Sequence, residues 1–310
     1  MTVNDHLGRF HGLPIHDFTP TGDPRRLPKP GDAAWRLSVE YDAEQGFPEL
    51  WRSLLDTVDP AGIRAVVIGP WWSGDYSPVD TVIATITGDA ERLPALEAVF
   101  LADVTYDECE ISWLTLGDVT PLLTTFPGLT ELAVRGGMDL VLKPVQHEKL
   151  TALRFESGGL PAEVVRAVGG SELPALERLT FWLGVGEYGG DATLDDLAPF
   201  LDGARFPALR HLGLANSELQ DEIAAAVAHA PVVARLRTLD LSMGVLSDEG
   251  AAALLEGQPL THLEILDLHH HYLSEEMQQR LTDALPDVVV DLGEPEEADE
   301  DDDRYVAVAE

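Results

Sequence analysis

Basic residues, cysteine and long apolar runs are all scarce in this chain of 310 residues. Its 20 lysines and arginines face 55 aspartates and glutamates, which leaves a formal net charge of −35 at pH 7. Because the averaged field around such a protein repels phosphates and anionic lipids, we expect neither nucleic acid nor a membrane surface as a partner. The single cysteine, Cys109, excludes an intramolecular disulfide framework and a cysteine-based zinc site.

The chain also has no apolar run that approaches the roughly 20 residues needed to span a bilayer. Its first residues carry Asp5, His6, Arg9 and His11 among a few apolar residues, so no signal-peptide core forms there. A lone cysteine is typical of a reducing compartment. We therefore expect a soluble, cytoplasmic protein.

What the chain does contain is a repeated spacing, in which an apolar residue is followed three and five positions later by two more. Eight such units occur in order: Ile63-Val66-Ile68, Leu96-Val99-Leu101, Leu129-Leu132-Val134, Leu150-Leu153-Phe155, Leu176-Leu179-Phe181, Leu209-Leu212-Leu214, Leu236-Leu239-Leu241 and Leu263-Leu266-Leu268. Their first residues are separated by 33, 33, 21, 26, 33, 27 and 27 positions. These intervals bracket the leucine-rich-repeat length of about 20 to 29 residues, with a few insertions.

The spacing has a geometric explanation. The second and third apolar residues of a unit lie two apart, so on a short strand they point to the same face. After the last three strands, the sequence predicts helices that begin near Leu219, Leu246 and Leu273, with Ser247 or Asp248 as a helix cap. We therefore predict an α/β leucine-rich-repeat solenoid, a right-handed horseshoe with at least seven parallel strands on its concave side and helices on its convex side.

The ends of the chain differ from this array, which we place at residues 63–292 with a final strand at Val288–Leu292. Residues 1–62 are predicted to form an N-terminal capping region, with a strand at Trp35–Tyr41 and a helix at Pro48–Val58. Residues 293–310 are predicted to be a disordered acidic tail, because 294–303 carry eight acids in ten residues. Truncation after Gly293 should then change the melting temperature by no more than about a degree or two.

Several strings resemble, as a set, a family of bacterial cytoplasmic leucine-rich-repeat proteins with no established activity. They are Asp107–Trp113, Val134–Gly137, Trp182–Gly184 with Tyr188–Gly190, and Leu266–Ser274. The last three units resemble the ribonuclease-inhibitor type of repeat. The resemblance implies a single-domain bacterial repeat protein over most of the chain, and it carries over no catalytic or binding residue.

The repeat also predicts which side chains face the concave side. They are small and apolar in the first units (Ala65, Val67, Ala98, Phe100), basic and aromatic in the middle (Arg135, Arg154, Arg178, Trp182), and acidic with histidine at the end (Asp240, Asp267, His269). Arginine and tryptophan are enriched in interface hot spots. We therefore predict a non-enzymatic scaffold that binds an unidentified protein through these last seven residues or through the rim loops. Alternatively, the arginines pair only with nearby Glu131, Glu156 or Glu177.

A second hypothesis concerns metal binding. The run His269-His270-His271 suggests imidazole ligands, but consecutive strand residues point in different directions. We interpret His271 as a structural residue that satisfies backbone groups, and His269 as a concave-face contact. The alternative is a metal-dependent enzyme, or an enzyme accessory protein, that uses Asp240, Asp267 and His269. Apart from this alternative, the sequence indicates no catalytic residue, cofactor or small-molecule substrate.

Three other features have structural explanations. Cys109 lies between Glu108 and Glu110, which should make its thiol a poor nucleophile. The loop 184–190 is glycine-rich but lacks a following Lys-Ser or Lys-Thr, so it is predicted to be a rim insertion rather than a phosphate loop. Trp71 and Trp72 either anchor a partner or cover the edge of the core.

Overall fold

The computed structural model of the chain describes residues 3–74 and 77–310. Within these residues, one open sheet holds twelve strands whose spatial order equals their order in the sequence. Neighbouring strands are parallel except in the antiparallel hairpin of β1 and β2. The strands are β1 (Arg9–Phe10), β2 (Leu13–Asp17), β3 (Ala34–Leu37), β4 (Ala65–Ile68), β5 (Ala98–Leu101), β6 (Glu131–Arg135), β7 (Ala152–Glu156), β8 (Arg178–Gly184), β9 (His211–Ser217), β10 (Thr238–Asp240), β11 (Ile265–Asp267) and β12 (Val289–Asp291).

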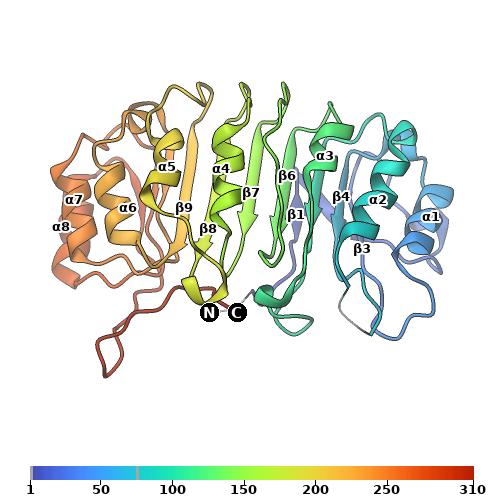
Figure 1. Cartoon of the computed structure of the whole chain (residues 1–310), viewed down its shortest axis with the longest axis horizontal. Helices are drawn as coiled ribbons and strands as arrows, with labels where there is room; N and C mark the ends of the chain where they lie inside the picture. Colours follow the sequence, from blue (N-terminus) through green and yellow to red (C-terminus); the bar gives the residue numbers. More distant parts are fainter. Residues whose placement is uncertain (1–2, 75–76) are drawn as a thin grey trace.

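Helices alternate with the strands and lie together on one face of the sheet (Figure 1). They are α1 (Phe47–Thr57), α2 (Asp80–Gly88), α3 (Thr120–Thr125), α4 (Ala162–Gly170), α5 (Leu194–Leu201), α6 (Gln220–Val227), α7 (Asp248–Glu256) and α8 (Glu275–Ala284). Each of the eight apolar triplets contributes to one parallel strand, β4 to β11, and the three expected helices are α6, α7 and α8. Ser247 and Ser274 cap α7 and α8 by accepting hydrogen bonds from backbone N–H groups. This part of the prediction is confirmed.

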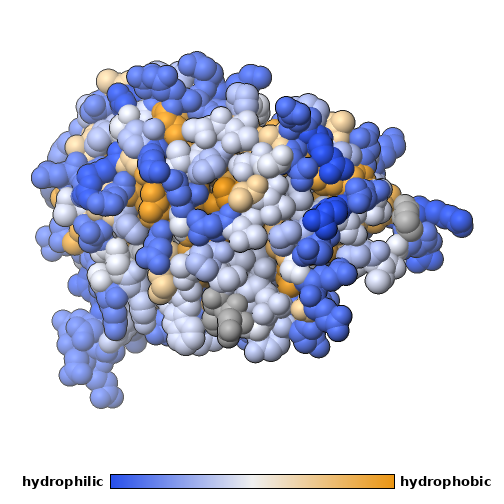
Figure 2. Space-filling view, turned by 45° about the vertical axis from the view of Figure 1, so that its right-hand side comes forward, coloured by the Kyte–Doolittle hydropathy of each residue, from blue (hydrophilic) through white to orange (hydrophobic). Residues whose placement is uncertain are grey.

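The apolar triplets build a continuous core between the sheet and the helices. Leu212, Leu239 and Leu266 lie in register on successive strands and are fully buried. Burial of one such side chain contributes about 2 kcal/mol. Since every unit packs against its neighbours, this stabilisation is distributed along the array. The surface in Figure 2 is mostly hydrophilic, with scattered apolar residues, as expected for a face whose apolar groups point inward.

A second, smaller apolar cluster lies on the opposite face of the sheet, which we call the open face. Here the N-terminal segment, residues 3–17, crosses the sheet behind the helices (Figure 1). Phe10 is buried against an apolar floor and meets the Phe100 ring edge-on at a centroid distance of 5.6 Å. The floor consists of Ala34, Ala65, Val67, Ala98, Phe100 and Ala133. The N-terminal segment therefore packs against the small apolar side chains of the first units.

The C-terminal segment, residues 304–310, also packs on the array. Val306, Ala307 and Val308 are buried. The Ala307 N–H donates to the Met243 carbonyl at 2.8 Å, and the Val308 N–H donates to Asn216 Oδ1 at 2.9 Å. The expectation of a disordered tail is therefore wrong for this segment, because the acidic run is followed by apolar residues that bury surface.

The acidic run itself forms a loop that projects from the body of the protein (Figure 1). Within this loop, Asp299 accepts hydrogen bonds from the backbone N–H groups of Asp301 and Asp303 at 3.0 and 2.9 Å. The adjoining strand β12 lies inside the predicted final strand, Val288–Leu292.

Trp71 and Trp72 cover the edge of the core and are only 5% and 6% exposed. Their rings meet edge-on, and the Trp71 indole N–H donates to the Ser77 carbonyl at 2.7 Å. They cannot act as exposed partner anchors. None of the described helices is long and apolar enough to cross a membrane.

Candidate functional site

The parallel register places side chains of successive strands in straight rows across the open face. One row, which we call the middle row, runs from β7 to β12 and consists of Arg154, Thr180, Gly213, Asp240, Asp267 and Asp291. A second row, two residues earlier on each strand, includes Arg178 on β8 and His211 on β9. Neighbouring strands lie about 4.8 Å apart, so residues in adjacent places of a row are close neighbours. Along the middle row the charge changes from positive to negative.

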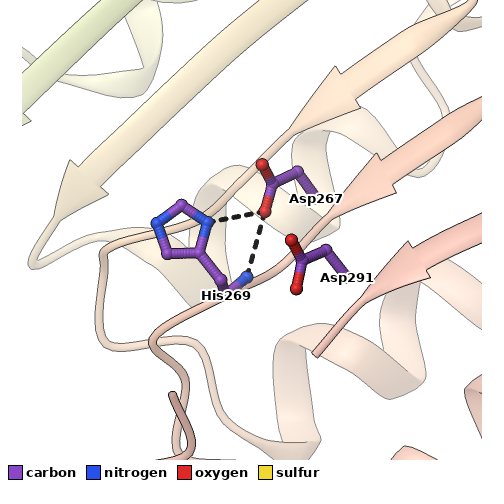
Figure 3. A group of neighbouring side chains, drawn as sticks. All are labelled: Asp267, His269 and Asp291. Atoms are coloured by element: carbon purple, nitrogen blue, oxygen red, sulfur yellow. Dashed lines mark hydrogen bonds and ion pairs between the residues drawn. The ribbon is translucent and has the colours of Figure 1, made fainter. Parts of the chain in front are cut away.

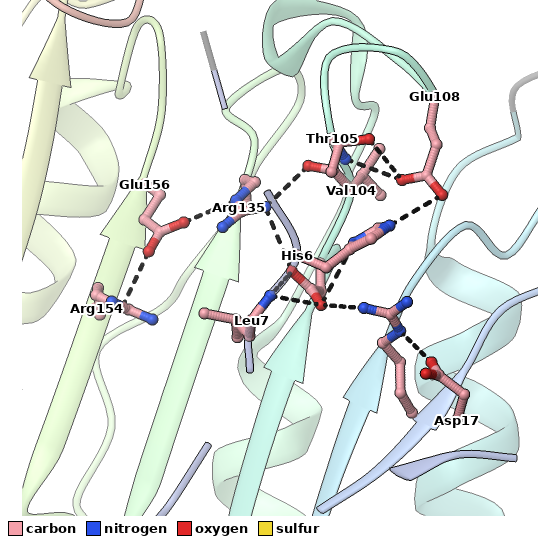
Figure 4. Close-up of polar contacts among 11 residues, drawn as sticks. His6, Leu7, Asp17, Val104, Thr105, Glu108, Arg135, Arg154 and Glu156 are labelled. Carbon is pink, nitrogen blue, oxygen red and sulfur yellow. Dashed lines mark hydrogen bonds and ion pairs between the residues drawn. The ribbon is translucent and has the colours of Figure 1, made fainter. Parts of the chain in front are cut away.

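Arg135 lies on β6, in register with Glu156 on β7, but it does not belong to an accessible site. Its side chain is only 4% exposed. The guanidinium donates to Glu156 Oε2 at 2.7 Å and to the Val104 carbonyl at 2.8 Å (Figure 4). The prediction that Arg135 contacts a partner is therefore wrong, because buried groups of this chain take up its donors.

Asp103, on the loop after β5, connects this ion network to the N-terminal segment. Its fully buried carboxylate lies 3.5 Å from Arg135 Nη1 and accepts a hydrogen bond from Arg36 Nη1 at 3.1 Å. The Leu7 N–H donates to it at 3.3 Å, and His6 Nδ1 lies 3.6 Å away. A buried carboxylate needs such partners, since an unpaired one is very costly. The network therefore fixes the N-terminal segment over the first half of the open face.

The second half of the open face holds a pocket of about 500 Å³ between the N-terminal hairpin and strands β7 to β11. The hairpin contributes Arg9, Phe10 and His11 to its lining. The sheet contributes Arg154, Arg178, Thr180, Trp182, His211, Asp240 and His269, among others. Five of the seven predicted partner-binding residues thus lie around one pocket. Arg135 is buried elsewhere, and Asp267 lies beside the pocket in the middle row.

The two arginines of the pocket differ in how they are held. Arg154 donates toward Glu156 at 3.1 Å, and its guanidinium lies over the Phe100 ring at 5.4 Å. Arg178 is exposed, and its guanidinium makes no hydrogen bond or ion pair with any residue that the structure describes. The alternative that the arginines pair with nearby glutamates therefore holds for Arg135 and Arg154, which both pair with Glu156. Glu131 pairs with no arginine among the described residues; its Oε2 lies 2.9 Å from His11 Nδ1. Trp182 is half-buried on the same strand as Arg178.

The charge at the centre of the pocket is low. Burial and the neighbouring Arg178 lower the pKa of His211, whose Nε2 is hydrogen-bonded to Thr180 Oγ1 at 3.1 Å. His211 is therefore neutral at pH 7. At the acidic end of the pocket, burial raises the pKa of Asp240, a hydrogen bond from Ser242 opposes this, and the neighbouring Asp267 carboxylate raises it further. Positive charge is thus concentrated at one end of the pocket and negative charge at the other.

Beyond Asp240, the side chains of Asp267, His269 and Asp291 form a group that could hold a metal ion (Figure 3). One ligand atom from each lies within 4.8 Å of the other two. His269 Nδ1 is 2.7 Å from Asp267 Oδ1, and this hydrogen bond raises the pKa of His269. Asp240, which the sequence hypothesis included, is not in this group, and Asp291 takes its place. In the register of β12, the first position of the repeat is the acidic Asp287 rather than an apolar residue, so the triplet pattern ends at β11 and does not include Asp291.

The three consecutive histidines point to three different environments. His271 is fully buried, with Nε2 3.2 Å from the Leu292 carbonyl and Nδ1 accepting from the Leu273 N–H at 3.1 Å. His270 Nε2 lies 2.9 Å from the Tyr305 carbonyl in the C-terminal segment. The interpretation of His271 as a structural residue is confirmed, and the triplet cannot bind one metal ion jointly.

Cys109 and the glycine-rich rim loop are also held by local contacts. Cys109 is buried, and its thiol donates to the Glu110 carbonyl at 3.4 Å. In the rim loop, the Tyr188 hydroxyl donates to Glu310 at the end of the C-terminal segment. This hydrogen bond is the main reason that the pKa of Tyr188 rises to about 12. The loop therefore already holds a segment of this chain.

No protein-family model and no curated protein matches the chain. A solved structure does match, that of a Bacteroides fragilis protein determined by the Northeast Structural Genomics Consortium. The two chains are 30% identical and superpose with a TM-score of 0.79, and the match covers 84% of this chain and 74% of the other. Identity at this level over most of both chains shows common descent, and this chain belongs to the same protein family as the Bacteroides fragilis protein.

Proposed function

We propose that the chain is a non-enzymatic leucine-rich-repeat scaffold whose open face binds a protein partner over strands β7 to β11. The observation that carries the proposal is Arg178, an exposed guanidinium in a pocket, without a partner among the described residues, in a chain of net charge −35. Trp182 lies four residues further along the same strand, on the same face, and lines the same pocket. Arginine and tryptophan around a pocket are the residue types most often found as binding hot spots.

The horseshoe form of the proposed repeat follows from the two layers. Packed helices need about 8 to 10 Å between their axes, whereas neighbouring strands lie only about 4.8 Å apart. The helical side of the array must therefore be longer than the sheet side, which makes the open face concave. A concave face suits a partner that enters it, and the N-terminal segment leaves only its second half free. A cytoplasmic location fits the single buried thiol.

The proposal is tested by capture from native lysate followed by mass spectrometry. Arg178→Ala/Trp182→Ala should fold as the wild type does and lose its partner. The loss should reach about 2 kcal/mol, or about thirtyfold in affinity. The variant changes Arg178 rather than Arg154 because Arg154 already has Glu156 as an ion-pair partner.

The matched control is Arg237→Ala/Trp113→Ala, which removes one exposed arginine and one exposed tryptophan outside the pocket. This control should capture the same protein as the wild type. Equal capture by both double variants would move the interface away from β7 to β11.

The group of Asp267, His269 and Asp291 supports a second candidate, a metal-dependent enzyme or an enzyme accessory protein. Carboxylate and imidazole ligands suit zinc and related divalent ions. Calorimetric titration with zinc separates the candidates: heat of binding that disappears in Asp291→Asn would favour the metal site. No heat at micromolar zinc would exclude it.

A further inference from the structure

We infer that the element bound by the open face is an extended, bipolar peptide segment, with acidic side chains at one end and basic side chains about four residues away. This inference rests on the proposed function and specifies the chemistry of its ligand. It follows from the order of charges across the pocket, from the neutral strip between them, and from the wall that closes one end.

The distance between the charges sets the spacing. Arg154 on β7 and Asp240 on β10 stand three strands apart in the middle row, which is about 14 Å at about 4.8 Å per strand. Arg178 on β8 and Asp267 on β11 are also three strands apart. An extended peptide advances about 3.3 Å per residue, so four residues cover about 13 Å. A peptide with two acidic residues, each four positions from a basic residue, would place its acids at Arg154 and Arg178 and its bases at Asp240 and Asp267.

The strip between the charges is suited to a peptide backbone. Gly213 occupies the centre of the middle row, and a Cβ atom there would lie 2.9 Å from Thr180 Cγ2 and 3.1 Å from Asp240 Oδ2. The Thr180 and Asp240 side chains close over the buried Gly213, so the uncharged groups that line the pocket here are those of Thr180 and His211. Thr180 and the neutral His211 border this strip, so no charge interrupts it.

Both ends of the pocket have charges that a ligand would neutralise. Arg178 has no ion-pair partner among the described residues. At the other end, Asp240, Asp267 and Asp291 stand on three successive strands and repel one another. His269 compensates Asp267, whereas the hydrogen bonds that Asp240 accepts come from the uncharged groups of Ser242. A lysine or arginine side chain from the partner would relieve this repulsion.

The N-terminal hairpin fixes the direction of the ligand. Arg9 and His11 line the pocket, and the contact of His11 with Glu131 places the hairpin at β6, next to the arginine end. They close the open face in that direction, and Arg9 adds a cation whose own hydrogen bond goes to the Gly12 carbonyl of the hairpin. The acidic end of the peptide must therefore stop or turn at the hairpin.

Four capped synthetic peptides test the inference by fluorescence polarisation with the full chain at low ionic strength. The first has the order Gly-Glu-Glu-Leu-Ser-Lys-Lys-Gly, with each acid four residues before a base. The second, Gly-Glu-Lys-Leu-Ser-Glu-Lys-Gly, has the same composition without that spacing. The third and fourth have only glutamate or only lysine at the charged positions. The first peptide should bind at least tenfold more tightly than each of the others.

Variants of the protein assign the two ends. Arg178→Glu and Asp267→Lys should each abolish the preference for the first peptide. Glu264→Lys makes the same charge change as Asp267→Lys at an exposed position on the flank of β11 outside the pocket, and it should keep the preference. Thermal melting of each variant confirms that it is folded.

Equal binding of the two isomeric peptides would overturn the inference, because charge order would then not matter. If the all-lysine peptide bound as tightly as the first peptide, the pocket would be a cation-binding site only. If the all-glutamate peptide did so, it would be an anion-binding site only. Either result would overturn the inference. Binding by none of the four would also overturn it. In a further outcome, the double variant Arg178→Ala/Trp182→Ala loses its partner from lysate while the wild type shows no preference among the peptides. That combination would support the proposed function and overturn only the inference that the ligand is bipolar.

Discussion

Asp103 joins more separate parts of the chain than its position in a loop would suggest. It is fully buried, and it receives donors from β3, β6 and the N-terminal segment, which are far apart in the sequence. Removal of its charge takes one of two counterions from Arg36 and from Arg135, which keep only Asp17 and Glu156 respectively, and it weakens a buried ion network. The arrangement of the open face therefore depends on a carboxylate that is buried beneath it.

Asp103→Asn should destabilise the protein by about 3 kcal/mol, the scale of a broken buried ion pair. The N-terminal segment should also be released, since both His6 and the Leu7 N–H lose their anionic partner. Denaturant unfolding measures the first effect, and hydrogen exchange of residues 5–17 measures the second. As a control, Asp17→Asn removes an exposed carboxylate that pairs with Arg36 and should cost less than about 1 kcal/mol. Equal effects of the two changes would contradict the central place of Asp103.

His11 should make the docking of the N-terminal segment depend on pH. Hydrogen bonds to Glu131 and Glu97 raise its pKa above 6.5, although burial opposes them, and Arg64 pairs with Glu97 from the other side. A raised pKa means that the contribution is complete below pH 6.5 and is lost as the pH rises through the raised value. The difference in unfolding free energy between wild type and His11→Gln should therefore be largest at acidic pH. A difference that grows toward alkaline pH would refute this account.

The sequence could predict the strand position of each arginine but not its accessibility. Arg135, Arg154 and Arg178 lie on neighbouring strands of the same face, as their spacing predicted. Whether each is free depends on Asp103, which is 32 positions from Arg135, and on Glu156. Pairing with Glu156 was one of the alternatives that the sequence offered, whereas the contact between Asp103 and Arg135 joins two units and is not visible in a repeat pattern.

At the scale of elements, the two chain ends decide how much of the array is open. The repeat predicted the eight strands β4 to β11 and the helices α6 to α8 because periodic burial is a local signal. The N-terminal segment gave a weaker signal. Phe10, Leu13 and Ile15 are apolar and close together, and Ala65 and Ala98 are small apolar residues on a face that otherwise turns to solvent. The two patterns together could have indicated that the segment covers this face.

The C-terminal segment should stabilise the array, contrary to what the acid content of residues 294–303 suggested. Removal of residues 304–310 exposes the surface of the array against which Val306, Ala307 and Val308 pack. The lost burial, less the entropy regained by the freed chain, amounts to about 2 kcal/mol, or about 4 °C in melting temperature. Circular dichroism melting measures this shift. In the control, Asp301→Asn/Asp302→Asn, the exposed loop is changed while the segment remains, and the melting temperature should stay within about a degree. A truncated chain that melts like the wild type would restore the expectation of an unpacked tail.

At the scale of the whole molecule, the stacked units and the excess of acid act in opposite directions. Each unit contributes apolar surface to a core that runs through the whole array. The 55 acidic residues against 20 basic ones give the chain a net charge of −35, and the mutual repulsion of this excess acid opposes the compact fold. The core must therefore overcome a repulsion that extends along the molecule, and the strength of this repulsion depends on the solvent rather than on any contact.

Salt should consequently stabilise the fold while it weakens binding at the pocket. The screening length falls from about 30 Å at 0.01 M to about 10 Å at 0.1 M, so repulsion between separate units fades while short ion pairs inside the buried network of Asp103 and Arg135 persist. We expect a gain of about 1 kcal/mol in the free energy of unfolding, seen as a rise of about 2 °C in melting temperature, over this range.

Choline chloride should match sodium chloride if screening is the cause, because choline is too large to bind between Asp267, His269 and Asp291. A rise with sodium alone would point to specific cation binding at that group. A melting temperature that falls with both salts would mean that surface ion pairs outweigh the repulsion among the acids.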